Sequence, residues 1–345
     1  MMLWRNLSPG VLRAAVSLPM LAALAAGGLE AGDPAPKRPN LKVISGRYLS
    51  FAPLAIASAE GFFEAQGLDV VLIHLPGSSE TTPSLIRGEV DVGAGPIKVA
   101  DFNAIARGVA LRIVADMGHD EAGGCVTAAL MARLGFLKAK GPHGSDHLRG
   151  ARITAAPFSF GEYVLETFVG SKGLQLSDLN LQRLQTSTTV EALSEGSLDF
   201  TYLAEPLVSS ASRSGRATVW KSLHEIVPDA QLATVIFGPS LVTRNRDAGR
   251  RFMVAYLQWV RQYNQGKTAR NVEILSKETG LEPELIREAC WVWIHGDGKI
   301  NVESVLDFQR WAVRRGVLNA PLPSERFWDP SFLNEANKIL GPPAP

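Results

Sequence analysis

Residues able to carry out covalent or metal chemistry are not arranged in a recognised catalytic motif in this sequence. The chain has no H-E-x-x-H, G-x-S-x-G or C-x-x-C pattern. The segment GAGPIK (93–98) lacks the third glycine of a dinucleotide-binding loop, and QGKTAR (265–270) lacks the earlier glycine of a phosphate-binding loop. We therefore expect no catalytic residues and no cofactor.

Two histidines have a spacing that suits a helical metal site. His143 and His147 lie four residues apart, but Pro142 and Gly144 disfavour a helix there, and no carboxylate motif completes a site. We interpret this stretch as part of a solvated surface loop (138–150). We therefore expect no metal site.

Acidic residues and a histidine gather in the segment DMGHDEAGG (116–124), directly after the apolar run LRIVA (111–115). Asp116, His119, Asp120 and Glu121 fit a polar loop that caps a strand. The alternative is that they line a ligand cleft. We favour the polar loop.

The sequence contains two cysteines, Cys125 and Cys290. An oxidising compartment would permit a disulfide between them, but two cysteines define no disulfide framework. We interpret them as two buried small apolar residues.

Several loops rich in Gly, Ser, Thr and Pro stand between expected strand ends and helix starts. In open α/β sheets, ligands bind beyond the carboxyl ends of the strands, where helix N–H groups and hydroxyls hold polar or anionic groups. A single Ser or Thr in such a place is more often an ordinary helix cap, so the prediction rests on the recurrence of these loops in both halves of the chain. The loops are 46–53, 76–82, 93–98, 156–162, 185–191 and 203–206.

The elements that would position these loops begin with a strand, a helix and a second strand. LKVIS (41–45) is β-branched, 54–67 has apolar residues at helical spacing, and Gly67 suits the end of that helix. LDVVLIHL (68–75) is almost continuously apolar, which predicts a strand buried on both faces of a parallel sheet. The order is that of a βαβ unit.

An internal echo supports two units of like topology. SLIRGEVDVGAGP (84–96) and ALSEGSLDFTYLAEP (192–206) both read L-x-x-G-x-x-D, then a short strand, then Pro. In each copy the leucine packs a helix end, the glycine caps it, and the aspartate opens the next strand. These equivalent positions are Leu85 and Leu193, Gly88 and Gly196, and Asp91 and Asp199.

Further elements follow from periodicity. We expect a strand at 151–156 and a helix starting near Ser159. The C-terminal part should be helical at 250–264, 282–294 and 301–316, the last with Val305 on its apolar face.

The N-terminus has the layout of a cleaved signal peptide (1–31). Arg5 and Arg13 precede an apolar run from Ala14 to Ala26 that is too short to span a bilayer and is interrupted by Pro19. The net charge of +1 gives no argument for nucleic acid as a partner.

The segments FAPLAIASAEGFFEAQGLDVVLI, SLIRGEVDVG, LRGARITAAPFSFGEYVLETFVGSKGLQLSDL and ALSEGSLDFTYLAEP resemble periplasmic binding proteins of the nitrate, sulfonate and taurine type. That family also includes binding proteins for thiamine-pyrimidine precursors. The resemblance implies an α/β protein of the type II periplasmic-binding fold. Lobe 1 would span 41–122 and 238–341, including the C-terminal helices, and lobe 2 would span 123–237.

The same resemblance implies a function and a site. A periplasmic monomer would capture a small polar or anionic solute and deliver it to an ABC permease with its ATPase. The loops carried over by position, together with one threonine from the hydroxyl-rich loops, give the expected ligand-binding residues. These are Arg47, Ser50, Phe51, Ser78, Ser79, Gly95, Pro96, Ser159, Phe160, Gly161, Thr188 and Glu205.

Three alternatives stay open at this point. Carboxylates beside these loops, such as Glu80 and Glu162, leave room for an amine-bearing or heteroaromatic ligand. A related pyrimidine-synthesising enzyme shares the fold, but the cysteine cluster expected of it is missing from this sequence. A sensor that presents liganded lobes to a membrane kinase is the third alternative.

Overall fold

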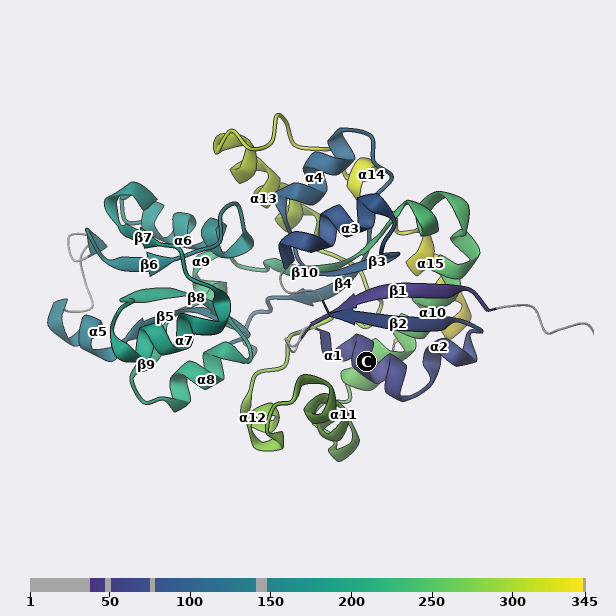
Figure 1. Cartoon of the computed structure of the whole chain (residues 1–345), viewed down its shortest axis with the longest axis horizontal. Coiled ribbons are helices and arrows are strands. Elements are labelled where there is room, and N and C mark those ends of the chain that lie inside the picture. The colour runs from purple at the N-terminus through teal and green to yellow at the C-terminus, as the bar shows by residue number, and fades with distance from the viewer. Residues whose placement is uncertain (1–37, 47–50, 75–77, 141–147, 344–345) are drawn as a thin grey trace, which may run out of the picture. The chain divides into compact units, whose positions relative to one another are not determined.

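The structure is a computed structural model that describes residues 38–46, 51–74, 78–140 and 148–343 (Figure 1). The predicted signal peptide lies outside the described residues, as do Arg47, Ser50, His143 and His147. The described part from Arg38 onward forms one compact unit.

A mixed five-stranded sheet combines four strands from the N-terminal part of the chain with one later strand, β10. Its strand order is β2-β1-β3-β10-β4, with β1 parallel to β2 and β3, and β10 antiparallel to β3 and β4. The parallel βαβ unit expected at the start of the chain is therefore confirmed. The strands are β1 (Asn40–Ser45), β2 (Asp69–His74), β3 (Val92–Pro96), β4 (Arg112–His119) and β10 (Gln231–Phe237).

The expected burial of β2 on both faces is wrong. β2 stands at the edge of the sheet, each of its residues is exposed or half-buried, and Val71 is 44% exposed. Continuous apolar character therefore did not distinguish this edge strand from a central one.

The helix expected at 54–67 is two helices, α1 (Ala52–Ala59) and α2 (Phe62–Ala65). The break falls at Gly61, whose φ of 69° is left-handed and ends the first helix before the second begins. The remaining helical segments around this sheet are η2 (Ser78–Glu80), α3 (Thr81–Arg87) and α4 (Val99–Ala106).

A second group of strands repeats the order of the first. β5 lies between β8 and β9 and is antiparallel to both, and β6 is parallel to β7. The amide of Asp199, just before β8, donates to the carbonyl of Arg152 in β6 at 2.8 Å, which places β6 beside β8. The resulting order β7-β6-β8-β5-β9 matches β2-β1-β3-β10-β4 strand for strand. The strands are β5 (Ala128–Arg133), β6 (Arg152–Thr154), β7 (Asn180–Gln182), β8 (Phe200–Ala204) and β9 (Ala217–Ser222).

The internal echo read from the sequence is confirmed in this topology. Gly88 ends α3 with φ 71°, and Gly196 ends α7 (Thr186–Glu195) with φ 82°, both left-handed caps. Leu85 and Leu193 are fully buried. The aspartate of each copy directly precedes a strand, β3 in the first and β8 in the second.

Two connections join the strand groups, residues 120–127 after β4 and residues 223–230 after β9 (Figure 1). β10 comes at the end of the range expected for lobe 2, yet it pairs with strands of the first sheet. The helical segments of the second group are α5 (Leu134–Lys140), α6 (Phe160–Gly170), η4 (Leu176–Asp178), α7, α8 (Leu207–Arg213) and α9 (Leu223–Ile226).

The C-terminal part is helical and packs mainly on the first sheet. The long helix α10 contacts α1, α2 and α15, and its Tyr256 and Trp259 are fully buried. The helix expected at 282–294 ends at Glu288, and the chain is non-helical from there to Ile294. The elements are η5 (Ser240–Arg244), α10 (Arg246–Tyr263), α11 (Ala269–Thr279), α12 (Pro283–Glu288), α13 (Val302–Arg314), α14 (Ser324–Phe327) and α15 (Ser331–Leu340).

Cys125 and Cys290 form a disulfide across 165 residues of sequence, with their Cα atoms 5.6 Å apart. The interpretation of two unpaired buried thiols is therefore wrong. The bond joins the first connection between the strand groups to the non-helical segment after α12. Sequence alone could not bring these distant positions together.

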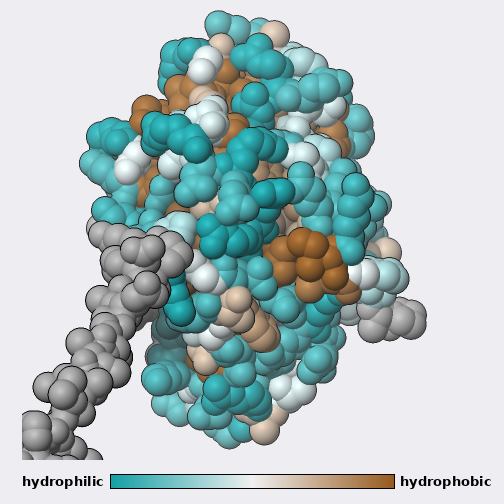
Figure 2. All heavy atoms as spheres, turned by 90° about the vertical axis from the view of Figure 1, so that its right-hand side faces the viewer, coloured by the Kyte–Doolittle hydropathy of each residue, from teal (hydrophilic) through white to brown (hydrophobic). Residues whose placement is uncertain are grey.

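The molecular face in Figure 2 is mostly hydrophilic, with apolar side chains gathered in separate areas. No helix in the described segments is long and apolar enough to cross a bilayer.

Candidate ligand-binding site

The predicted ligand loops of the two units meet directly. Lys98, just after β3, and Ser159, just before α6, form an isolated antiparallel bridge. One residue belongs to the loop that follows the first repeat, and the other to the loop that follows β6. We call this contact the Lys98–Ser159 junction.

Lys98 brings a largely shielded positive charge to the junction. Its side chain is 15% exposed, and its ammonium lies 3.9 Å from the carboxylate of Asp101. That carboxylate also accepts a hydrogen bond from the Thr82 hydroxyl at 2.5 Å. Among the described residues, the Asp101 carboxylate is the one anionic group paired with Lys98, and because it is distant the ammonium can hold a second anion.

On the side of the first sheet, the Phe51 ring packs closely against two glycines. A Cβ atom added to Gly46 would lie 2.9 Å from the Phe51 ring, and one on Gly95 would lie 3.4 Å from it. Gly95 also has a left-handed φ of 131°, so two constraints favour glycine there. Phe51 is buried, whereas Pro96 and Ser79 are exposed, and nothing is described of the Ser78 side chain.

On the side of α6, the predicted Phe160 and Gly161 pack inward rather than facing open space. Phe160 is 3% exposed and lies 6.0 Å from the Tyr202 ring. A Cβ on Gly161 would lie 3.0 Å from that ring. Burial raises the pKa of Tyr202, and Asp120 adds to the shift, so the phenol stays protonated.

Phe158 is an exposed aromatic residue that the sequence analysis did not assign to the site. It is 43% exposed and holds a left-handed φ of 54°, and its amide donates to Glu162 at 2.5 Å. Unfavourable backbone conformations of this kind persist where the surroundings impose them, often at ligand sites. In the sequence, only the position of Phe158 within the loop 156–162 indicated that it could belong to the site.

The predicted hydroxyls at the helix starts are engaged in local bonds. Ser159 caps α6 by accepting from the Glu162 amide at 3.2 Å and donates to the Ala156 carbonyl at 2.7 Å. Thr188 donates to the Gln185 carbonyl at 3.0 Å. These two residues are therefore helix-capping or turn residues in this structure.

Glu205 is also engaged. Its carboxylate accepts from the Ser209 hydroxyl at 2.7 Å, the Ser209 amide at 3.1 Å and the Cys290 amide at 3.1 Å. Burial raises the pKa of Glu205 against these hydrogen bonds. The side chain holds the start of α8 to the disulfide segment, and so a structural role accounts for it.

Two other buried hydroxyls have no partner among the described residues. Ser45 Oγ lies at the end of β1, and Thr127 Oγ1 lies just before β5. Buried hydroxyls are normally hydrogen-bonded, so each is available to a ligand or a water molecule. Ser45 occupies the strand end at which ligands bind in such folds.

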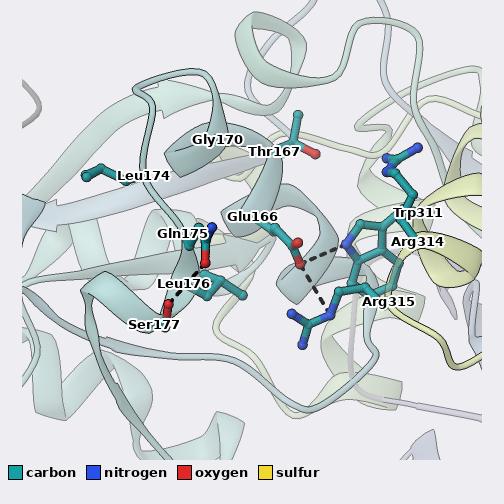
Figure 3. Close-up of a pocket in the computed structure, with 10 residues that line it drawn as sticks. All are labelled: Glu166, Thr167, Gly170, Leu174, Gln175, Leu176, Ser177, Trp311, Arg314 and Arg315. Carbon is teal, nitrogen blue, oxygen red and sulfur yellow. Dashed lines mark hydrogen bonds and ion pairs between the residues drawn. The ribbon is translucent and has the colours of Figure 1, made fainter.

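Two pockets of similar size lie away from the junction. One, of about 340 Å³, lies between α6 and α13, where Glu166 accepts from Trp311 Nε1 at 3.0 Å and pairs with Arg315 at 3.5 Å (Figure 3). The other, of about 330 Å³, is lined by Glu205 and the disulfide. Of the predicted site residues, only Glu205 lines either pocket.

The segment 116–124 differs from the loop expected there. β4 continues through His119, so Asp116 is a fully buried strand residue. Asp116 and His119, together with the distant His295, form a group that could hold a metal ion. Nearby, Asp120 accepts from His224 at 2.7 Å, and burial raises the pKa of Asp120 despite this bond.

Several solved structures share this fold. The periplasmic aliphatic sulphonate binding protein SsuA from Escherichia coli is 14% identical with a TM-score of 0.68, covering 86% of this chain and 94% of its own. The periplasmic nitrate-binding protein NrtA from Synechocystis is 15% identical with a TM-score of 0.70, covering 89% and 90%. The desulfurization enzyme DszB is 12% identical with a TM-score of 0.61, covering 88% and 100%.

These likenesses confirm the predicted α/β fold, that of periplasmic binding proteins. No curated protein matches the sequence significantly. The profile of the family described as NMT1/THI5 like matches residues 49–260, which end within α10. Because this match covers more than half of the chain, the protein belongs to the NMT1/THI5-like family.

Proposed function

We propose that the protein is a non-catalytic, periplasmic, monomeric binding protein that captures a small polar or anionic organic solute and delivers it to an ABC importer. The observation that carries the proposal is the Lys98–Ser159 junction, where loops from the two repeated units pair through their backbones at a residue whose ammonium group is largely shielded. Two units of matching strand order provide the facing surfaces that such a capture needs.

The charge at the junction favours an anion. Lys98 supplies a positive charge, and α6 begins beside it with the N-terminal end that favours negative groups. Because SsuA and NrtA are a sulphonate-binding and a nitrate-binding protein, these two solute classes are the first to test. The Ser45 hydroxyl, which has no partner among the described residues, would add a hydrogen bond to the same class of ligand.

A heteroaromatic ligand, such as a thiamine-pyrimidine precursor, is the second candidate. The exposed Phe158 ring stands next to Ser159, and the Phe51 ring packs at the end of β3. Flat rings stack on aromatic side chains, so an anionic ring compound would use both the aromatic groups and Lys98.

The test is a thermal-shift screen of the chain from Gly32 onward against nitrate, alkyl and aryl sulfonates, taurine, aromatic carboxylates and thiamine-pyrimidine precursors. A ligand that binds only the native state raises the melting temperature, by an amount that grows with its concentration. We expect a rise with one class, with the ligand recovered chemically unchanged. Turnover of the ligand would instead establish an enzyme on this fold, as DszB is.

A further inference from the structure

The turn before α6 has an aromatic residue where a glycine would fit without strain. The Ser159 amide donates to the Ala156 carbonyl at 3.4 Å, which closes a four-residue turn. Its middle residues are Pro157 and Phe158. Proline suits the second position of such a turn, but a left-handed third position normally takes Gly or Asn. Phe158 occupies that position with φ 54°, which points to a role for its side chain.

The Phe158 ring is open to solvent beside the predicted anion site. Phe158 is 43% exposed, and the next residue, Ser159, pairs with Lys98 at the junction. Flat rings stack on aromatic side chains. A ring in this place can therefore distinguish an aryl solute from an alkyl solute that carries the same anionic group.

Glu162 holds the unfavourable conformation of Phe158. The Phe158 amide donates to Glu162 Oε2 at 2.5 Å, and the Glu162 side chain is only 3% exposed. In a capping box, the carboxylate of Glu162 would accept from the amide of the N-cap residue, Ser159. That amide instead donates to Ala156 within the turn. The carboxylate therefore fixes the Phe158 turn and not the end of the helix.

A cation from the C-terminal part of the chain supports Glu162. Arg315, directly after α13, lies 3.7 Å from Glu162 Oε1. A carboxylate is costly to bury unless it is paired, and Arg315 is the cation paired with Glu162 among the described residues. Arg315 also lies 3.5 Å from Glu166, which accepts from Trp311 Nε1 (Figure 3).

Helix α13 brings Arg315 to α6 from the first sheet. The start of α13 is bonded to β10, because the Ser304 hydroxyl accepts from the Gln231 amide at 2.8 Å. Further along, α13 contacts α6 of the second strand group. The support for Glu162 therefore crosses from one strand group to the other.

We propose that Glu162, paired with Arg315, is a positioning residue that holds the Phe158 ring at the ligand site and makes the site favour aryl over alkyl anions. The inference rests on the proposed function, because it takes the Lys98–Ser159 junction as the place where the anion binds. It adds the feature of the ligand that Phe158 recognises, and it assigns the control of that feature to a buried residue behind the turn.

The test compares benzenesulfonate with methanesulfonate, which carry the same anionic group, by isothermal titration calorimetry on the chain from Gly32 onward. Phe158 should contribute about 3- to 10-fold to a preference for benzenesulfonate, the range expected of one aromatic contact. Glu162→Ala should lose this contribution, because the Phe158 amide loses its acceptor. Glu162→Gln keeps an oxygen acceptor and should retain it.

A second variant shows whether Glu162 acts through Phe158. Phe158→Gly fits the left-handed turn and removes an exposed ring, so the fold should be kept and the same contribution lost. In the Phe158→Gly background, Glu162→Ala should then change the preference no further. An equal effect of Glu162→Ala with and without the ring would contradict the positioning role.

Glu166→Ala is the matched control. Glu166 lies on the same helix and pairs with the same arginine, but its bonds are to Arg315 and Trp311 and not to the turn. It should leave the preference unchanged, whereas Arg315→Met should reduce it at least about twofold. Full preference in Arg315→Met would contradict the part assigned to Arg315.

The wild type separates this inference from the proposed function. Binding of both sulfonates without a preference for benzenesulfonate would overturn the inference alone. Binding of neither sulfonate would contradict the proposed sulfonate site and the inference together. Circular dichroism checks that each variant is folded.

Discussion

The two repeated units share their backbone bonds but differ in what their aspartates bind. In the first unit, the Asp91 amide donates to the Lys42 carbonyl at 2.8 Å and the Asp91 carboxylate accepts from the Lys42 amide at 2.9 Å. In the second, Asp199 makes the same two bonds with Arg152, both at 2.8 Å. The remaining partners of the two carboxylates differ. The Asp91 carboxylate accepts from the Ser240 hydroxyl, whereas the Asp199 carboxylate pairs with two arginines.

The strand ends of the two units differ in a related way. The first unit leads to Lys98, whose ammonium lies 3.9 Å from the Asp101 carboxylate, and to Ser45, whose hydroxyl has no partner among the described residues. The second leads to Glu205, whose carboxylate is fully engaged with Ser209 and Cys290. The two units therefore share a backbone arrangement but differ at their strand ends. The polar groups named in the first unit are available to a ligand, whereas Glu205 in the second is engaged in bonds within the protein.

The largest expected effect of a substitution is at Asp199. Asp199→Ala leaves two arginines without their shared anion, which should lower the free energy of unfolding by about 3 kcal/mol. Asp91→Ala loses hydrogen bonds alone and should cost about 1.5 kcal/mol. Urea denaturation measures both, with the exposed Asp69→Ala as a control within about 0.5 kcal/mol of wild type. Equal losses at Asp199 and Asp91 would show that the two units do not differ in this respect.

The loss of folding stability at acid pH should depend on Asp199. Hydrogen bonds from Arg152 and Arg133 outweigh burial and lower its pKa from 3.8 to about 2. A lowered pKa means that the unfolded chain takes up the proton first, so this stability is present above about pH 4 and is lost as the pH falls toward 2. The contribution is about 2 kcal/mol.

Asp199→Asn should therefore flatten the unfolding free energy between pH 4 and 2, measured by urea denaturation at each pH. A pH dependence identical to wild type would contradict this account of Asp199.

Replacing the glycine that caps a helix should lower the free energy of unfolding equally in the two units. Gly88 and Gly196 have left-handed φ values of 71° and 82°, and among the described residues a Cβ would meet nothing closer than 3.8 Å at either position. Alanine should therefore cost about 1 kcal/mol in each case, from backbone conformation rather than from collision. Urea denaturation of Gly88→Ala and Gly196→Ala measures this, and a difference of more than about 1 kcal/mol between them would break the equivalence.

The smallest effect is expected at Glu205, whose contribution to stability should change with pH in the opposite direction to that of Asp199. Burial raises its pKa, so the stability linked to its proton is greatest at low pH and is lost as the pH rises through the folded-state pKa. Glu205→Gln keeps a carbonyl acceptor and removes this dependence. Thermal unfolding between pH 4 and 8 should show a shallower decline for the variant, and a steeper one would contradict the assignment.

Local signals in the sequence predicted the repeated framework well. Leu85, Gly88 and Asp91 are fixed by burial, left-handed backbone and strand start, which act over a few residues and leave a readable pattern in both copies. The edge position of β2 was not readable, because its apolar side chains are the same as those of a central strand.

The site was less predictable, because it depends on contacts between distant segments. The hydroxyls of Ser159 and Thr188 carry the composition of a ligand loop, yet they are engaged in local hydrogen bonds. The shielding of Lys98 and the pairing of Cys125 with Cys290 appear only when the chain is folded. Composition therefore predicts candidate loops, but it does not predict which of their groups are already engaged in bonds within the protein.

The most direct test of the proposed function is the affinity of the solute found by screening for wild type and for Lys98→Met, by isothermal titration calorimetry. Loss of a charge-assisted hydrogen bond should weaken binding about 10- to 100-fold, whereas the exposed Lys172→Met should bind as wild type does. Unchanged affinity in Lys98→Met, with the fold intact, would contradict a binding site at the Lys98–Ser159 junction.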